Sequence, residues 1–186
     1  IKIINKDVLD VNENTLSENK LLVFGNLPYN ISTEILSKWI LNLKNNFCFS
    51  NLILMFQKEV ADRIISNFNN SNYGRLSILV NWKLNVSKIV DVDPKCFYPI
   101  PKVESTVLNF FPKPSFFEIK DPKNLELITR IFFSQRRKMI KKPLNKLFSN
   151  ASEICKKLNI DNNLRPQNLE PEMYYNLTRE LEKLRG

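Results

Sequence analysis

The spacing of apolar residues constrains the fold of this chain more than any other feature. Short, nearly continuous apolar runs occur at Leu21–Gly25 and Leu52–Phe56, and such runs are typical of strands covered on both faces in a parallel sheet. Between them, apolar residues recur at helical spacing: Ile35, Leu36, Trp39, Ile40 and Leu43. Ser32 or Thr33 can cap this predicted helix. Strands that alternate with helices predict an α/β fold with a doubly wound sheet.

Further apolar runs extend this pattern along the chain. Helices are predicted from Lys58 onward and again after Tyr73-Gly74. Val86–Val92 and Val103–Phe111 are predicted to be strands. The loop between these two strands leaves no room for a crossover helix, so they should pair antiparallel.

The first residues, Ile1–Ile4, also have the composition of a strand. A domain rarely opens on a bare buried strand, and the chain does not begin with Met. We therefore expect natural sequence upstream of Ile1, so that the sheet is incomplete at its N-terminal side.

From Pro112 onward the pattern becomes helical. One amphipathic face is formed by Leu125, Ile128, Ile131 and Phe132. A second helix should begin near Ser134, and shorter ones are expected at Ser152–Leu158 and Pro171–Leu184. Pro112, Pro114 and a shift in charge coincide between residues 111 and 121, and Pro122 follows directly. We therefore predict two domains, residues 1–112 and residues 113–186.

Charge is distributed unevenly between these two parts. Residues 1–112 hold 12 basic and 10 acidic side chains, whereas residues 113–186 hold 16 basic and 9 acidic ones. A near-neutral first part and a basic second part suggest that the second part meets a polyanion. A genome-wide bias toward Lys and Asn is the alternative explanation.

Several kinds of site are excluded by what the sequence lacks. It has no histidine, and its three cysteines, Cys48, Cys96 and Cys155, are far apart. No zinc pattern can be assembled, so no metal is expected, and no mechanism can use a His base. Scattered single cysteines fit a reducing cytoplasm. No apolar run is long enough for a membrane span.

One strand-to-helix turn carries the strongest functional signal. It reads Asn26-Leu27-Pro28-Tyr29 after an apolar strand, at the sheet edge where open α/β folds bind ligands. An exocyclic adenine amine is a poor nucleophile because its lone pair is delocalised into the ring. Hydrogen-bond acceptors at both N–H groups, here the Asn26 side-chain oxygen and the Pro28 carbonyl, would favour a pyramidal nitrogen. Tyr29 offers a ring for an extruded base, although an ordinary turn with Tyr29 in the core is the alternative.

Other segments accompany this turn in a characteristic order. They are Leu54-Met55-Phe56-Gln57-Lys58-Glu59-Val60-Ala61-Asp62-Arg63-Ile64, Tyr73-Gly74-Arg75-Leu76-Ser77, Phe97-Tyr98-Pro99-Ile100-Pro101-Lys102-Val103-Glu104-Ser105 and Phe133-Ser134-Gln135-Arg136-Arg137-Lys138. In this order and spacing they resemble the ribosomal RNA adenine-N6 dimethyltransferase family of the small-subunit type across nearly the whole chain. The resemblance implies a Rossmann-like class I methyltransferase sheet, a small all-α C-terminal domain and S-adenosylmethionine as cofactor.

The resemblance also implies roles for individual residues. Asn26, Pro28 and Tyr29 match the motif for the target amine, in which the Asn also lies beside the methyl donor. Phe97 matches the aromatic residue that packs on the target adenine opposite the Tyr. Asp7 matches the acidic residue that contacts the adenine moiety of S-adenosylmethionine. The family's Gly-rich cofactor loop is absent from this sequence, so we expect the chain alone to be inactive and to bind the cofactor weakly or not at all.

A basic segment is expected to hold ribosomal RNA, as the resemblance implies for this region. Its cations, uninterrupted by any acid, are Arg136, Arg137, Lys138, Lys141, Lys142 and Lys146. Arg137, Lys138, Lys141 and Lys142 would share one side of a helix, and such a face supplies affinity for phosphates. Pro143 should kink or end that helix.

The implied function is N6,N6-dimethylation of two adjacent adenosines in the 3′-terminal hairpin of 16S rRNA during small-subunit maturation. Two alternatives stay open: a macrolide-resistance-type methyltransferase of large-subunit rRNA, and a non-catalytic RNA-binding assembly factor. Gln57-Lys58-Glu59-Val60, followed by Tyr73-Gly74, favours the small-subunit type. DNA adenine methylation is disfavoured because that group usually has Pro-Pro-Tyr in the turn. The expected protein is a cytoplasmic monomer that binds the immature 30S particle and no membrane.

Overall fold

The computed structural model describes residues 1, 3–42 and 48–186. The chain divides into two compact units, residues 1–61 with 84–113 and residues 62–83 with 114–186. Residues 62–83 thus group with the C-terminal helices rather than with the sheet. The division into domains 1–112 and 113–186 stays a prediction.

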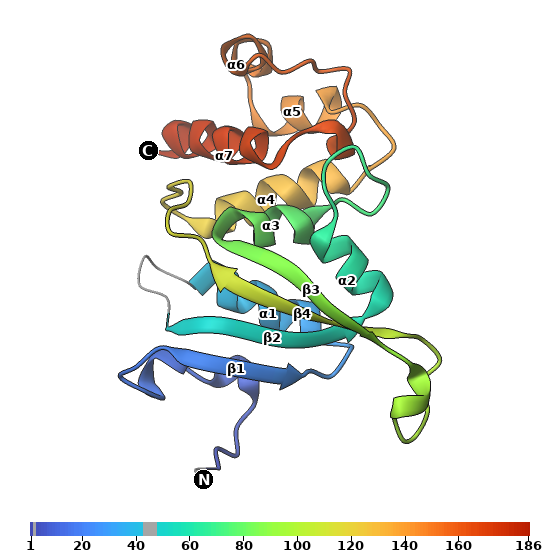
Figure 1. The fold of residues 1–186 in the computed structure, drawn as a ribbon. Helices are drawn as coiled ribbons and strands as arrows, with labels where there is room; N and C mark the ends of the chain where they lie inside the picture. The colour runs from blue at the N-terminus through green and yellow to red at the C-terminus, as the bar shows by residue number, and fades with distance from the viewer. Residues whose placement is uncertain (2, 43–47) are drawn as a thin grey trace. The chain divides into compact units, whose positions relative to one another are not determined.

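The first unit is built around a four-stranded sheet (Figure 1). Its strands are β1 (Leu21–Asn26), β2 (Phe49–Gln57), β3 (Leu84–Val92) and β4 (Ser105–Pro112). Their spatial order is β1-β2-β4-β3, with β1 and β2 parallel and β4 antiparallel to both of its neighbours. The four strands predicted after residue 20 are confirmed. The antiparallel last pair is confirmed as well, because the β3–β4 connection holds only a short 3-10 turn, η3 (Pro94–Cys96).

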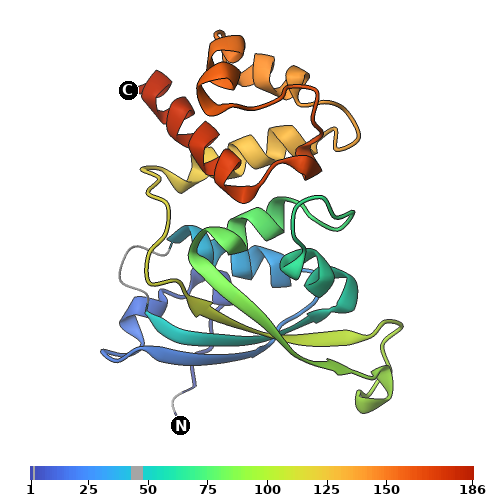
Figure 2. The same cartoon turned by 45° about the horizontal axis from the view of Figure 1, so that its top comes forward.

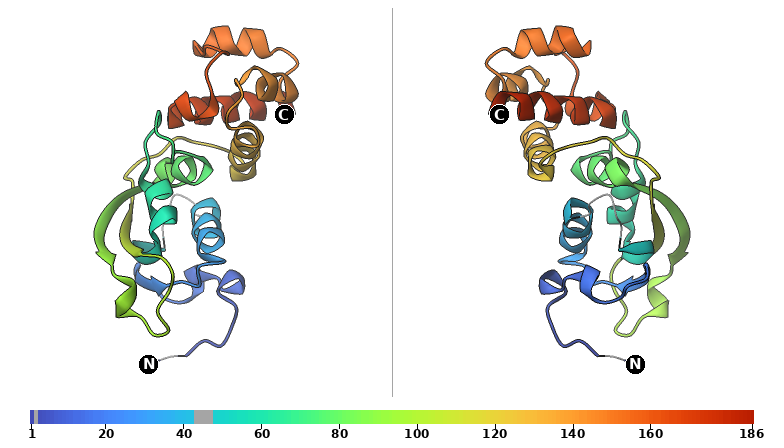
Figure 3. Two further views of the ribbon diagram at one scale, coloured as in Figure 1. Left: turned by 90° about the vertical axis from the view of Figure 1, so that its right-hand side faces the viewer. Right: turned by 90° about the vertical axis from the view of Figure 1, so that its left-hand side faces the viewer.

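Helix α1 (Ser32–Asn42) lies along one face of this sheet (Figure 3). Ile35, Leu36 and Ile40 are fully buried, and Trp39 is nearly so. These four residues form the inner face that the helical spacing predicts, while Leu43 lies outside the described residues. The Ser32 hydroxyl donates to the Tyr29 carbonyl at 3.1 Å, which ties the start of the helix to the preceding turn.

The expected strand at Ile1–Ile4 is not formed by Ile1, Ile3 and Ile4, the described residues of that segment. All three are exposed and have no regular secondary structure. A strand needs a neighbouring strand for its backbone hydrogen bonds, and no described strand pairs with these residues. The prediction was therefore wrong for this structure.

The second unit is helical, as the sequence pattern predicts. Its helices are α3 (Arg75–Lys83), α4 (Pro122–Phe133), α5 (Lys141–Leu147), α6 (Ala151–Leu158) and α7 (Pro171–Arg185), with a 3-10 turn η4 (Pro166–Asn168). Helix α2 (Lys58–Ile65) begins in the first unit and ends in the second. α7 lies beside α4 (Figure 2), and the rings of Tyr174 and Phe132 meet edge to face at 5.5 Å. The Tyr175 hydroxyl donates to the Ile78 carbonyl at 3.0 Å, so aromatic side chains connect three helices of this unit.

The helix expected to begin near Ser134 begins instead at Lys141. Residues 134–137 form a turn. Pro143 occupies the first turn of α5, where a backbone N–H would have no partner within the helix, so the N–H that proline lacks is not missed. Pro143 therefore sets where the helix can start, rather than kinking it in the middle. The consequence is that Arg137 and Lys138 do not share a helix with Lys141 and Lys142.

Candidate active site

The turn between β1 and α1 presents polar groups at the carboxyl end of β1. Asn26 is the last residue of the strand, and both Asn26 and Pro28 are exposed. The Pro28 carbonyl accepts the Ile31 N–H at 3.1 Å, which closes the turn and leaves the oxygen a second lone pair. Gly25 allows close packing under the turn, because a Cβ atom there would lie 2.8 Å from Leu54 Cδ2. The backbone is thus fixed on both sides of Asn26.

A cavity of about 340 Å³ opens beside this turn. The β1–α1 turn contributes Asn26, Leu27, Pro28 and Tyr29 to its lining, and the β3–β4 loop contributes Phe97, Tyr98, Pro99 and Pro101. Its volume falls within the range of roughly 300–1,000 Å³ that small-molecule sites occupy. The structure thereby brings together the four residues expected to handle the target base, from two segments about seventy positions apart in sequence.

Tyr29 is held by a hydrogen bond to the far side of this site. Its hydroxyl lies 2.7 Å from the Ser105 Oγ, at the first residue of β4. Ser105 is fully buried, whereas Tyr29 is half-buried. One end of the ring is therefore anchored while part of its surface stays on the cavity wall. This geometry differs from the alternative in which Tyr29 is simply a core residue.

Lys58 contacts both ends of the loop that carries Phe97. Its ammonium group lies 3.2 Å from the Asp91 carboxylate and 3.8 Å from that of Glu104, and its backbone N–H donates to the Glu104 carbonyl at 2.9 Å. Asp91 is the last residue but one of β3 and Glu104 precedes β4, so Lys58 contacts both ends of the loop. Hydrogen bonds from Lys88, Thr106 and Lys58 hold the pKa of the Asp91 carboxyl well below its usual range.

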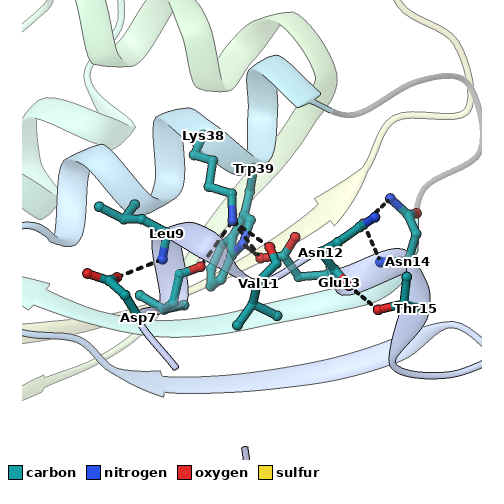
Figure 4. A network of polar contacts seen from close by, with 10 residues as sticks. Asp7, Leu9, Val11, Asn12, Glu13, Asn14, Thr15, Lys38 and Trp39 are labelled. Atoms are coloured by element: carbon teal, nitrogen blue, oxygen red, sulfur yellow. Dashed lines mark hydrogen bonds and ion pairs between the residues drawn. The ribbon is translucent and has the colours of Figure 1, made fainter. Parts of the chain in front are cut away.

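Asp7 lies in a separate part of the same unit, in a segment fastened to α1 (Figure 4). Its Oδ1 accepts the Leu9 N–H at 2.9 Å and caps the 3-10 turn η1 (Val8–Asp10). Asp7 is exposed and is not among the residues that line the cavity. Among the described residues its Oδ2 has no hydrogen-bond partner, so one carboxylate oxygen is available to a ligand.

The segment that carries Asp7 is fixed by Lys38, which points from α1 toward it (Figure 4). The Lys38 ammonium donates to the Val8 and Val11 carbonyls at 3.0 and 2.7 Å and to the Glu13 carboxylate at 3.2 Å. Glu13 also accepts the Trp39 indole N–H at 2.7 Å. The same helix that follows the Asn26 turn thus holds the Asp7 segment in place.

Arg136 is committed to contacts within the second unit. Its guanidinium donates to the Gln167 side chain at 3.2 Å and to the carbonyls of Asn70 and Ser71, and it lies over the Phe133 ring at 6.0 Å. The remaining predicted RNA contacts, Arg137, Lys138, Lys141 and Lys142, are all exposed. Within the described residues the side chains of these four cations have no hydrogen bond or ion pair. Arg136 thus has partners within the protein, whereas the side chains of the other four have none among the described residues, and RNA binding by these five residues stays a prediction.

The supporting side chains of the site were not identified from the sequence. Ser105, Lys58 and Lys38 act through contacts between segments 20 or more residues apart. Lys58 and Ser105 lie within motifs that carry the family resemblance, Gln57-Lys58-Glu59 and Glu104-Ser105. Their place in these motifs was the one sequence signal for a role at the site. The sequence pattern gave no indication of Lys38.

The chemistry available in the cavity is hydrogen bonding and ring contact. None of its eight lining residues carries a carboxylate, an ammonium or an imidazole. Across the described ranges there is no cluster of three or more His, Cys, Asp or Glu side chains that could hold a metal ion. In the same residues, no helix has the length and apolar character needed to cross a bilayer.

The sheet, the polar turn at a strand end and the adjoining cavity define a Rossmann-like methyltransferase. The whole chain but its last three residues, 1–183, matches the ribosomal RNA adenine dimethylases, and the protein belongs to this family. The family resemblance that the motifs predict is confirmed. Membership in it implies an enzyme that uses S-adenosylmethionine as methyl donor.

Named relatives agree with this assignment. The chain is 68% identical to a ribosomal RNA small subunit methyltransferase A of Pelagibacter ubique over all of its own length and 71% of the relative. It is 45% identical to the protein of that name from Ehrlichia chaffeensis, over 92% of this chain and 64% of the relative. The chain thus spans about two thirds of the length of these curated relatives.

Solved structures agree on the fold. A dimethyladenosine transferase from Plasmodium falciparum matches with a TM-score of 0.70 and 28% identity, over 87% of this chain and 66% of that one. The 23S rRNA methyltransferase ErmE matches with a TM-score of 0.63 and 18% identity, over 96% and 71% of the two chains. The second likeness concerns the fold alone.

Proposed function

We propose that the protein dimethylates N6 of two adjacent adenosines in the 3′-terminal hairpin of 16S rRNA during maturation of the small ribosomal subunit. The observation that supports this most is the cavity that unites Asn26, Pro28, Tyr29 and Phe97. The small-subunit names of the similar proteins, at 68% and 45% identity, favour this substrate over large-subunit RNA. Action in the cytoplasm as a monomer stays a prediction.

Asn26 and Pro28 act on the target amine as hydrogen-bond acceptors. The Asn26 Oδ1 accepts one N–H and the Pro28 carbonyl accepts the other. With both hydrogens held, the nitrogen lone pair is directed away from the ring system and toward the electrophile. These acceptors stand at a turn that is already fixed by the Ile31 N–H and by packing around Gly25, so little reorganisation is needed at the moment of reaction.

Tyr29 and Phe97 hold the extruded base between two rings. Base flipping exchanges stacking within the RNA for stacking on protein side chains. The Ser105 hydrogen bond at 2.7 Å keeps the Tyr29 ring from rotating out of the wall. The ion pairs of Lys58 with Asp91 and Glu104 keep the Phe97 loop at a fixed distance from the strand ends.

Asp7 and Asn26 are proposed to contact the methyl donor. S-adenosylmethionine, when bound, supplies the electrophilic methyl group. Asp7 has one carboxylate oxygen free for a ligand among the described residues, and the other fixes the local turn. This arrangement suits an acceptor for an exocyclic amine of the donor's adenine. Lys38 and Glu13 hold the segment in the conformation that presents it.

Exposed cations of the second unit are proposed to hold the RNA. Arg137, Lys138, Lys141 and Lys142 are exposed, and neutralising phosphates with them supplies affinity without reading sequence. Arg136 contributes by fixing the loop at Asn70 and Ser71 rather than by contacting phosphates.

A chimera with a relative tests the proposed function. The chain is joined to the part of the Pelagibacter ubique relative that it does not span, and the product is assayed for N6-dimethyladenosine in under-methylated small subunits. Asn26→Ala should reduce the methylation rate at least roughly 100-fold, as loss of a preorganised hydrogen-bonding group does in other enzymes, with RNA affinity unchanged. Asn30→Ala is the matched control, because Asn30 is exposed and outside the cavity lining.

Three outcomes would count against the proposal. Full activity of the Asn26→Ala chimera would remove the acceptor role. RNA binding without any methylation, by a chimera that binds S-adenosylmethionine, would instead indicate a pure assembly factor. Methylation of large-subunit RNA in preference to small subunits would indicate the macrolide-resistance type.

A further inference from the structure

The rim of the cavity carries an aromatic side chain that the proposed chemistry does not use. Tyr98 lines the cavity next to Phe97, yet its exposure is 100%, equal to that of an extended peptide. Large aromatic side chains usually bury most of their surface. Among the described residues Tyr98 has no hydrogen bond or ring contact, so its whole ring is available to a ligand.

The backbone around Tyr98 is held firmly. Asp93 caps η3 by accepting the Lys95 N–H at 2.8 Å, and the Phe97 N–H donates to the Pro94 carbonyl at 3.1 Å. Pro99 and Pro101 follow, and proline fixes its own φ angle. The loop therefore presents the Tyr98 ring from a restricted backbone, and little conformational entropy is lost when a ligand binds to it.

Charges on this loop favour an anionic partner. The two acids are already engaged: Asp93 caps η3, and Glu104 lies 3.8 Å from the Lys58 ammonium. Lys95 and Lys102 are exposed and have no ion pair within the described part of the chain. Tyr98 lies between these two lysines in sequence. An exposed ring on a loop with uncompensated ammonium groups matches a nucleotide, which offers a base to stack and a phosphate to pair.

We propose that Tyr98 stacks on the base of the nucleotide next to the flipped adenosine, forming a second base site at the rim of the cavity. This inference rests on the proposed function, since it assumes that the cavity holds one extruded base. The neighbouring base loses a stacking partner when the adenosine leaves the helix, and Tyr98 replaces that partner. A polypeptide bound to the same exposed ring is the competing outcome.

The test compares two substrates and two variants in the chimera described above. The substrates are the RNA hairpin and the same hairpin with an abasic nucleotide next to the target adenosine. Tyr98→Ala should raise KM for the intact hairpin at least roughly five-fold, the lower end of what base–aromatic stacking supplies, while kcat stays within about two-fold. Tyr98→Phe keeps the ring face and should match the parent. On the abasic hairpin, Tyr98→Ala and the parent should have equal KM values.

Controls separate this proposal from folding defects and from the proposed function. Ile89→Ala truncates another exposed apolar side chain, 53% exposed on β3, and should leave KM unchanged. Equal loss for Tyr98→Ala on both hairpins, or a defect in Tyr98→Phe as large as in Tyr98→Ala, would overturn the stacking role. If the parent chimera does not methylate, the proposed function fails, and the affinities of the two hairpins, measured by fluorescence anisotropy, still decide whether Tyr98 contacts the neighbouring base.

Discussion

The hydrogen bond between Tyr29 and Ser105 offers a direct test of how the cavity wall is held. Tyr29→Phe removes the hydroxyl that lies 2.7 Å from the fully buried Ser105 Oγ. A buried hydroxyl left without its partner costs about 1–3 kcal/mol. Ser105→Ala leaves the half-buried Tyr29 hydroxyl close to water, so its cost should be about 0.5–1.5 kcal/mol. The double variant should lose less than the sum of the two, with a coupling of about 0.5–1.5 kcal/mol.

Urea unfolding of the four proteins measures these free energies, with equal slopes showing that the unfolding reaction is unchanged. Tyr175→Phe is the matched control: it removes a hydroxyl that donates to the Ile78 carbonyl at 3.0 Å in the other unit. It should lower stability without changing KM of the chimera for RNA, whereas Tyr29→Phe should raise KM. Additive losses from Tyr29→Phe and Ser105→Ala would show that the two hydroxyls do not interact and that the cavity wall is held in another way.

Three further outcomes follow from the charges and contacts. A single charge reversal, Arg137→Glu, Lys138→Glu or Lys141→Glu, should reduce the log–log salt slope of RNA binding by roughly 0.7–0.9 per lost phosphate contact. Arg136→Ala should instead lower the melting temperature and leave this slope unchanged. Equal slopes for all four variants would show that Arg136 does not differ from the other three cations in its contact with phosphates. Burial lowers the pKa of Lys83 from 10.5 to about 8, so the unfolded chain binds more protons between those values and the free energy of unfolding should rise with pH from about 8; Lys83→Met should flatten that rise in denaturation curves. Calorimetry of this chain alone should detect no micromolar affinity for S-adenosylmethionine, because its three glycines are far apart in sequence and cannot form the Gly-rich loop that the family uses to hold this cofactor. Micromolar binding would show that the residues present are sufficient for the cofactor site.

Local patterns were sufficient to predict most secondary structure. The inner face of α1 follows from apolar residues at helical spacing, and all four of its described members are buried. The antiparallel pairing of β3 and β4 follows from a loop too short for a crossover. Predictions of secondary structure were wrong where a contact with a residue far away in sequence decides the local structure. Ile1–Ile4 has strand composition, but strand formation depends on a neighbour that composition does not reveal.

Pro143 shows how a single residue can move a boundary. The cationic run predicts a helix from Ser134 that Pro143 kinks or ends. The structure instead uses the proline in the first turn of α5 and leaves Arg136 to bridge to Asn70 and Ser71. A charged side chain that serves a distant loop looks the same in sequence as one that faces solvent.

For the candidate site, too, local features could be predicted from the sequence and contacts between distant segments could not. The Asn26–Tyr29 turn was predictable because its chemistry lies in four consecutive residues, and the resemblance added Phe97. The hydrogen bonds that anchor Tyr29 to Ser105 and the Asp7 segment to Lys38 could not be predicted, because hydrogen bonds between distant segments produce no periodic pattern in the sequence.

The central claim is that two oxygens, at Asn26 and Pro28, hold the amine of a base enclosed by Tyr29 and Phe97. A crystal structure of the chimera with the hairpin and an unreactive analogue of the methyl donor measures this most directly. We expect an adenine N6 within about 3.2 Å of both the Asn26 Oδ1 and the Pro28 carbonyl oxygen, with the Tyr29 ring on one side of the base and the Phe97 ring on the other. An adenosine bound elsewhere, or a base in the cavity whose amine faces neither oxygen, would contradict it.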